Sequence, residues 1–112
     1  MIIVQGSIPI RSECREQAIA MAKEMIVASR SELGCISYEF YTALSDPNCL
    51  VLFQEWEDAE SLQAHYATPH MDAFLRRLPD ILDGEIITRR YAVQSVEEEQ
   101  AVVVAAEKPT IH

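Results

Sequence analysis

Hydrophobic residues recur at every second position in several short stretches of the chain, which is the spacing of a β-strand with one covered face. The clearest case is residues 35–42, where Ile36, Tyr38 and Phe40 share one face and more polar side chains share the other. Ser45-Asp46-Pro47-Asn48 is a cluster of turn-forming residues, which predicts a hairpin with the strand that follows. The other stretches apolar and β-branched enough for strands are residues 2–8, 49–55 and 85–93.

Between these strands, hydrophobic residues recur every three or four positions, as on one face of an amphipathic helix. One such helix begins near Ser12 and ends at Gly34. A second begins at Asp58, whose side-chain oxygen can accept from the free N–H groups of a first helical turn. It is interrupted at Thr68-Pro69, where threonine can cap a new helix and proline can take its first position. The inner-face residues expected on these helices are Cys14, Ala18, Met21, Ala22, Met25, Ser29, Leu33, Leu62, Met71, Phe74, Leu75 and Leu78.

The element order is therefore strand, helix, hairpin, broken helix, strand, which predicts an α+β fold. Both helices must lie on the sheet, because no other apolar surface is available to receive them. The strands also carry Tyr38, Phe40, Val51, Phe53 and Tyr91, which is too much apolar and aromatic surface to leave in water. We therefore expect a homodimer that packs sheet against sheet.

Composition and charge exclude several classes of protein. The 112 residues are most economically one domain, and the formal net charge of −9 argues against nucleic acid or an anionic membrane as a partner. The longest apolar run, residues 101–106, is far shorter than the ~18 residues that a membrane span needs. Residues 1–6 show neither the basic start nor the long apolar core of a secretory leader, and three widely spaced cysteines suggest neither a disulfide framework nor a zinc finger, so we expect a soluble, unexported protein of the reducing cytoplasm.

The last part of the chain differs from the rest. Residues 94–112 contain the acidic run Glu97-Glu98-Glu99 and the apolar run at 101–106. We interpret residues 1–93 as the folded domain and 94–112 as an extension. The valines at 102–104 favour an added strand over a helix, because β-branched residues lose rotamer freedom in a helix.

The candidate chemistry lies where the third strand passes into the second helix. Trp56 ends the strand, and His65 and Tyr66 follow on the helical face of Leu62. His65 is the first candidate for an acid or base, since imidazole titrates near neutral pH. His70 lies in a first helical turn, where the helix dipole disfavours imidazolium, so it would be neutral and available.

A metal site is not expected from the spacing of these histidines. His65 and His70 are five residues apart, about 140° around an ideal helix, and Thr68-Pro69 interrupts the helix between them.

Arg89 and Arg90 point to opposite faces of the last strand, so at most one of them faces a cavity. Cys35 is interpreted as a packed thiol.

Two sequence segments make the chain similar to a known family. Residues 32–39 carry G-C-x-x-Y-E, and residues 53–58 carry E-W-x-D, which is followed by His65 and His70 in the pattern H-x-x-x-x-H. With the element order, these motifs resemble the antibiotic biosynthesis monooxygenase family, in particular its small quinol-monooxygenase-like members. The resemblance covers roughly residues 1–93.

The resemblance implies a ferredoxin-like antiparallel sheet with helices on one face, which pairs with a second copy as a dimeric α+β barrel. It also implies a cavity between sheet and helices, and a monooxygenase that acts without metal, flavin or haem on a small quinol- or anthrone-like aromatic and dioxygen. Such an enzyme needs a dry cavity, a proton acceptor and a donor to the developing oxyanion. The catalytic candidate is His65, and the substrate-binding candidates are Trp56, Tyr66, His70, Arg89, Arg90, Phe53 and Tyr38.

The chain departs from parts of that family. Haem-degrading relatives use an asparagine on the first strand, and Val4-Gln5-Gly6 supplies none. Oxygenases of polyketide aromatics use a tyrosine soon after the tryptophan, where this chain has Leu62. The alternatives are an isomerase or haem-handling relative on the same fold, or a dimeric small-molecule-binding or stress-response module without catalysis.

Overall fold

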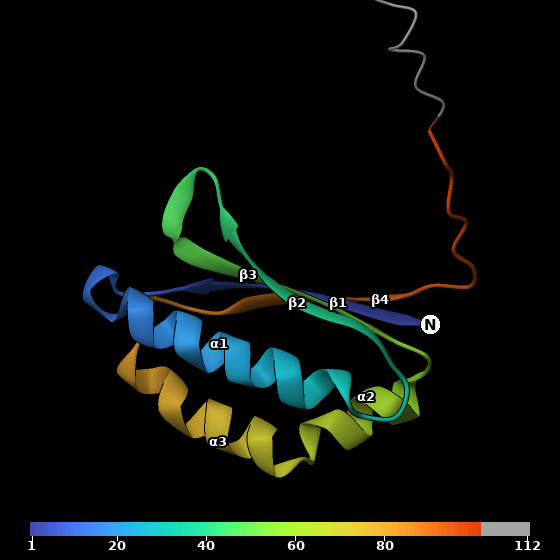
Figure 1. Ribbon diagram of the computed structural model, residues 1–112, viewed down its shortest axis with the longest axis horizontal. Helices are drawn as coiled ribbons and strands as arrows, with labels where there is room; N and C mark the ends of the chain where they lie inside the picture. Colours follow the sequence, from blue (N-terminus) through green and yellow to red (C-terminus); the bar gives the residue numbers. More distant parts are fainter. Residues whose placement is uncertain (102–112) are drawn as a thin grey trace, which may run out of the picture.

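The computed structural model describes residues 1–101, and these form one four-stranded antiparallel sheet with the helices on one face (Figure 1). The strand order across the sheet is β2-β3-β1-β4, which is the ferredoxin-like α+β arrangement that the sequence predicts. Most of the apolar run at 101–106 lies outside the described residues, so its strand stays a prediction. The elements are β1 (Ile2–Pro9), η1 (Ser12–Cys14), α1 (Arg15–Arg30), β2 (Cys35–Ala43), β3 (Asp46–Trp56), α2 (Ala59–Tyr66), α3 (Pro69–Arg77), η2 (Leu78–Asp80) and β4 (Ile87–Ala92).

The β2–β3 hairpin is tighter than expected. Its strands run to Ala43 and from Asp46, so only two residues form the turn. The register also shifts between Cys35 and Ser37, and Ile36 at this bulge is 49% exposed. The prediction that Ile36 shares the buried face of Tyr38 is therefore wrong, because a bulge adds a residue and breaks the alternation of a strand.

Helix α1 ends at Arg30, earlier than the sequence predicts. Leu33, expected on the inner face, is 94% exposed, because it lies in the turn that follows the helix. Gly34 closes this turn with a φ of +85°, in the left-handed region that glycine adopts without steric cost. The N–H of Glu57 donates to the carbonyl of Gly34 over 2.9 Å, which ties the turn to the end of β3.

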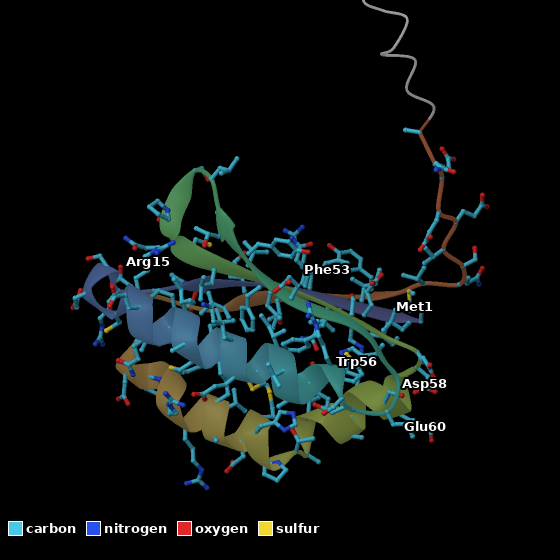
Figure 2. The ribbon with its side chains drawn as sticks, in the orientation of Figure 1. Met1, Arg15, Phe53, Trp56, Asp58 and Glu60 are labelled. Carbon is cyan, nitrogen blue, oxygen red and sulfur yellow. The ribbon has the colours of Figure 1, made fainter. Side chains whose placement is uncertain are left out.

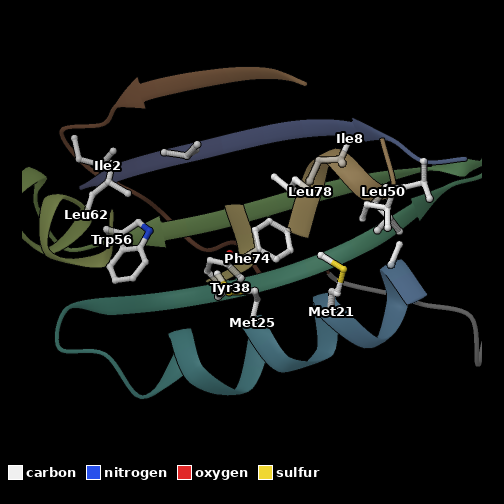
Figure 3. Close-up of a cluster of buried hydrophobic side chains, with 14 residues drawn as sticks. Ile2, Ile8, Met21, Met25, Tyr38, Leu50, Trp56, Leu62, Phe74 and Leu78 are labelled. Carbon is white, nitrogen blue, oxygen red and sulfur yellow. The ribbon is translucent and has the colours of Figure 1, made fainter. Parts of the chain in front are cut away.

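A single apolar core fills the space between sheet and helices (Figure 3). The expected inner-face residues of α1 at positions 18, 21, 22, 25 and 29 are all buried. Trp56 and Leu62 are fully buried, and burial of a leucine side chain contributes about 1.5–3 kcal/mol. Leu75 is 50% exposed, so the apolar stripe of α3 is narrower than its spacing predicts.

The break between α2 and α3 follows the predicted chemistry. The Asp58 carboxylate accepts from the N–H of Ser61 over 2.8 Å, which caps α2. The Thr68 hydroxyl accepts from the N–H of Met71 over 3.2 Å, and Pro69 is the first residue of α3. No helix among residues 1–101 is both long and apolar enough to cross a membrane.

The second face of the sheet carries no helix among the described residues (Figure 1). Gln5 of β1 pairs with Phe53 of β3 and with Arg89 of β4, so these three side chains lie on this outer face. Tyr41 and Ile87 on the same face are 55% and 62% exposed. The expected excess of apolar surface is therefore found on this face, although Tyr38 and Phe40 belong to the covered one.

Candidate functional site

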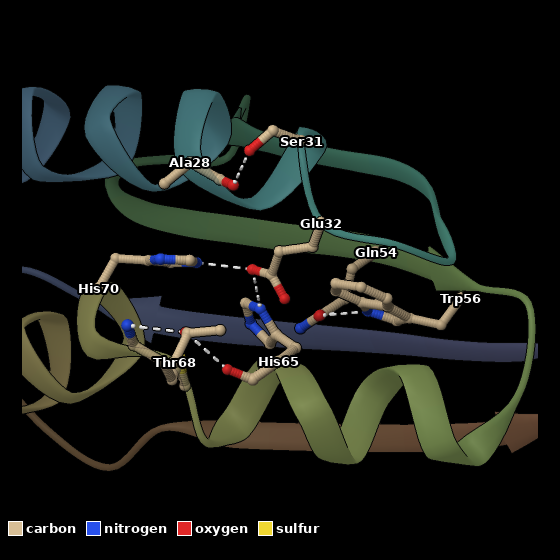
Figure 4. A network of polar contacts seen from close by, with 9 residues as sticks. Ala28, Ser31, Glu32, Gln54, Trp56, His65, Thr68 and His70 are labelled. Carbon is tan, nitrogen blue, oxygen red and sulfur yellow. Dashed lines mark hydrogen bonds and ion pairs between the residues drawn. The ribbon is translucent and has the colours of Figure 1, made fainter.

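One carboxylate oxygen and two imidazoles form the centre of the candidate site (Figure 4). Oε2 of Glu32 lies 2.8 Å from Nδ1 of His65 and 2.6 Å from Nε2 of His70. The side chain of His65 is fully buried, whereas those of Glu32 and His70 are 13% and 28% exposed. The cluster thus runs from the surface at His70 to the interior at His65.

Three local structures bring this cluster together. Glu32 lies in the turn between α1 and β2 that Gly34 closes. His65 is in the last turn of α2, and His70 is in the first turn of α3. Because the helix axis changes at the break, both rings face Glu32, which a continuous helix would not allow at this spacing.

The hydrogen bond to Glu32 determines the form of the His65 ring. An ionised carboxylate only accepts hydrogen bonds, so Nδ1 of His65 carries the proton and donates it. In the neutral ring Nε2 then keeps its lone pair. Nε2 is buried and has no hydrogen-bond partner among the described residues, so it is free to accept a proton.

Trp56 forms one wall of this site. Its ring centroid lies 4.8 Å from that of His65, with 37° between the planes. Its indole N–H donates to Oε1 of Gln54 over 2.7 Å, which satisfies the only polar atom of a fully buried side chain. The tryptophan and the histidine therefore converge, as their consecutive elements predict.

A cavity of about 140 Å³ lies beside the cluster, between the sheet and α3. Neither His65 nor Trp56 lines it directly. Gln54, the partner of Trp56, and Tyr66, the neighbour of His65, both do, and Thr88 is the third polar side chain in its wall. The remaining lining residues are apolar or glycine: Val4, Gly6, Ile8, Leu52, Met71, Phe74, Leu75, Leu78 and Ile86.

Tyr38 and Cys35 complete the surroundings of His65. The ring centroid of Tyr38 lies 5.5 Å from that of His65. Burial raises the pKa of the Tyr38 phenol well above its usual range, so the phenol stays neutral at physiological pH. Burial, with the nearby negative charge of Glu32, also raises the pKa of Cys35, which argues against a reactive thiolate.

The structure brings together only part of the residue set predicted for substrate binding. His65, His70, Trp56 and Tyr38 form one group, and Tyr66 joins it at the cavity while 42% exposed. Phe53 lies on the opposite face of the sheet from Trp56 (Figure 2), so it does not meet His65.

The two arginines of β4 also lie apart from His65. Arg89 is on the outer face, where it lines a depression with Gln5, Ser7 and Ile87. Arg90 pairs with Val4 on the helix side, but it is exposed on this edge strand and does not line the cavity.

Glu32 is the site residue that the sequence analysis misses. It belongs to the segment that carries the family resemblance, yet a glutamate after an amphipathic helix is ordinarily a solvated residue. The one sequence signal for it is its place two residues before Gly34, the glycine that the sequence predicts to end the helix. Glu32, His65 and His70 also form the group among residues 1–101 that could hold a metal ion, because their three possible ligand atoms lie within 4.8 Å of one another.

The chain is similar to several known proteins. A family model described as antibiotic biosynthesis monooxygenase matches residues 1–77. An uncharacterised protein of Synechocystis, sll1783, is 37% identical over 81 residues, which are 72% of this chain and 55% of that protein. The chain therefore spans little more than half of that relative's length. Rv0793 of Mycobacterium tuberculosis, whose name describes it only provisionally as a monooxygenase, is 32% identical over 83 residues, 74% of this chain and 76% of that protein.

Solved structures agree with the fold. The structure of Rv0793 superposes with a TM-score of 0.81 at 24% identity and covers 87% of this chain and 98% of its own. A conserved protein of Methanosarcina mazei Go1 gives a TM-score of 0.77 at 29% identity, with 80% of this chain and 89% of that chain covered. The family match spans most of the folded domain, including Glu32, both histidines and Trp56. The chain therefore belongs to the antibiotic biosynthesis monooxygenase family.

Proposed function

We propose that the protein is a cofactor-independent monooxygenase that oxidises a small quinol-like aromatic ring with dioxygen. Family membership supports the reaction class. The observation that carries the proposal is the buried His65 ring, whose Nδ1 is held by Glu32 and whose Nε2 has no hydrogen-bond partner within residues 1–101. A neutral imidazole in this arrangement is a general base whose tautomer is already set.

The cavity indicates the size of the substrate. A cavity of about 150 Å³ with apolar walls holds a benzene-sized molecule. The 140 Å³ cavity beside Gln54 and Tyr66 therefore suits one ring, and a three-ring anthrone would require its walls to move. The carbonyl and amide of Gln54 and the hydroxyl of Tyr66 are available to orient the ring hydroxyls.

Tyr66 lies next to both the cavity and the base. Its ring centroid lies 5.8 Å from that of His65, and its side chain lines the cavity while remaining partly exposed. In the proposed reaction, rotation of this side chain toward solvent opens the way from the cavity to Nε2 of His65. We therefore assign Tyr66 the role of a movable wall on the substrate side of the base.

The chemistry balances without an added reductant. His65 takes a phenolic proton at Nε2, and the quinolate transfers one electron to dioxygen. The semiquinone and superoxide that result combine to form a C–O bond, the peroxide takes the proton back from His65, and the hydroperoxide loses water. For 1,4-dihydroxybenzene the products are a hydroxybenzoquinone and one water, so one oxygen atom enters the ring and the other is reduced. Glu32 balances the positive charge that develops on His65.

The test is oxygen uptake with 1,4-dihydroxybenzene under ¹⁸O₂, after subtraction of autoxidation. We expect one labelled oxygen in the product and a kcat/KM that falls about 10²-fold or more in His65→Ala, the usual contribution of a positioned base. Glu60→Gln is the matched control, since Glu60 is an exposed α2 residue outside the cluster. Equal rates in His65→Ala and wild type, or quinone formed without labelled oxygen, would contradict the proposal.

We also propose a homodimer that packs through the outer sheet face, in the cytoplasm. The exposed Tyr41 and Ile87 and the half-buried Phe53 support the interface. The odd number of cysteines supports a reducing compartment. In sedimentation experiments Ile87→Glu should shift wild-type dimer toward monomer, because it introduces two buried charges across a twofold interface. A wild-type protein that sediments as a monomer at micromolar concentration would refute this interface.

A further inference from the structure

We propose that Glu32, His65 and His70 form a binding site for a divalent first-row transition ion such as Zn²⁺ or Co²⁺. Two imidazoles and one carboxylate are the borderline ligands that these ions take in proteins. The donor atoms are Oε2 of Glu32, Nδ1 of His65 and Nε2 of His70, which lie within 4.8 Å of one another. Nothing in the proposed oxidation chemistry requires this ion.

The present distances are those of hydrogen bonds, and the change needed for a metal ion is small. With metal–ligand bonds of about 2.0–2.2 Å, the donor atoms of a tetrahedral ion lie roughly 3.3–3.5 Å apart. The two O···N distances of 2.8 and 2.6 Å must therefore lengthen slightly, and the imidazoles must approach each other. His70 can make that movement, because its side chain is 28% exposed in the first turn of α3.

The surroundings favour an ion that enters from the side of His70. His65 is fully buried and Glu32 is 13% exposed, so the inner ligands are shielded while water can supply the remaining ligand at the surface. The backbone around the inner ligand is also held, since the Thr68 hydroxyl donates to the carbonyl of His65 over 2.7 Å. The helix break therefore removes the objection that five-residue spacing raises against a two-histidine site.

Metal binding would have a defined effect on the base. A neutral imidazole carries one N–H proton, so an ion at Nδ1 of His65 leaves that proton on Nε2. Nε2 then becomes a donor and can no longer accept a proton from a phenol. This consequence rests on the proposed function, and it makes the ion an inhibitor of cofactor-independent oxidation.

Binding is tested without turnover, by titration of the metal-free protein with CoCl₂ and with ZnCl₂. We expect one Co²⁺ per chain with the intense visible absorption of a four-coordinate ion, displaced by one equivalent of Zn²⁺. Glu32→Gln and His70→Ala should each weaken binding at least about 100-fold, since loss of a supporting residue around a metal alone costs 10–100-fold. Because the side chain of His70 is partly exposed, His70→Ala should fold even if Glu32→Gln does not. Circular dichroism verifies that both variants are folded.

The matched control is again Glu60→Gln, an exposed glutamate that should bind Co²⁺ as wild type does. No Co²⁺ band or binding heat in wild type, or binding unchanged in both cluster variants, would overturn the metal site. If the oxidation is observed, one equivalent of Zn²⁺ should abolish it and EDTA should restore it. If Co²⁺ binds and no oxidation is found, the metal site stands and the proposed function fails alone.

Discussion

Gly34 is the position where a single methyl group should disturb both the fold and the candidate site. Its φ of +85° is a conformation that costs an L-residue roughly 1–2 kcal/mol. A Cβ added there would lie 2.0 Å from Oγ and 2.5 Å from Cβ of Ser61, so the start of α2 must move. Overpacking of this kind costs about 1–3 kcal/mol. Gly34→Ala should therefore lower the free energy of unfolding by about 2–5 kcal/mol.

Urea denaturation followed by fluorescence measures this directly, because Trp56 is the single tryptophan and is fully buried. With a slope of about 1–3 kcal/mol per molar urea, a loss of about 3 kcal/mol lowers the midpoint by at least about 1 M.

A double-mutant cycle separates the two causes. In Ser61→Gly the nearest remaining atom, the Cα, is 3.8 Å from the added Cβ, which is an ordinary contact. The Gly34→Ala penalty should therefore shrink by about 1–3 kcal/mol in the Ser61→Gly background, leaving the backbone strain. A penalty below about 1 kcal/mol, or one that Ser61→Gly leaves unchanged, would refute the reasoning.

Three other substitutions test separate parts of the structure. Leu62→Ala should destabilise by about 2–5 kcal/mol in the same assay, because the side chain is fully buried, and a value under about 1 kcal/mol would mean that the core is packed differently. Arg76→Ala should change stability by less than about 0.5 kcal/mol, since its ion pair with Asp72 at (i, i+4) is exposed on both sides. Hydrogen bonds from the backbone N–H and the hydroxyl of Ser61 lower the pKa of Asp58. The ionised Asp58 side chain therefore stabilises the fold at pH values above the ordinary carboxyl pKa, and this stabilisation is lost as the pH falls through the pKa of the folded state. The melting temperature of the wild type should therefore fall more between pH 6 and pH 3 than that of Asp58→Asn, because the asparagine amide caps the helix without titrating. Equal decreases in the two proteins would argue against this cap.

The fold could be predicted because its signals are local. Asp58 and Thr68 cap helices through their own side chains, and Pro69 determines its own φ, so sequence alone locates the break between α2 and α3. The errors occur where tertiary structure overrides spacing. Leu33 continues a helical period but lies in a turn, and Ile36 continues a strand period but lies at a bulge.

The candidate site could be predicted only where its residues are close in sequence. Trp56 and His65 follow each other through one strand-to-helix junction, and their contact was predictable. Glu32 is 33 and 38 residues away from His65 and His70 in the sequence, and hydrophobic periodicity cannot predict a contact between residues so far apart. Phe53 shows the opposite error, since it is near Trp56 in sequence, but successive residues of a strand alternate between faces.

The break at Thr68-Pro69 connects the folding argument to the chemical one. An uninterrupted helix would direct His70 about 140° away from His65, and only one imidazole could then contact Glu32. With the break, one carboxylate holds two rings, and the buried ring keeps a free Nε2 that no other described residue approaches as a partner. The position of the break, between the two histidines, is therefore what allows both rings to share one carboxylate oxygen.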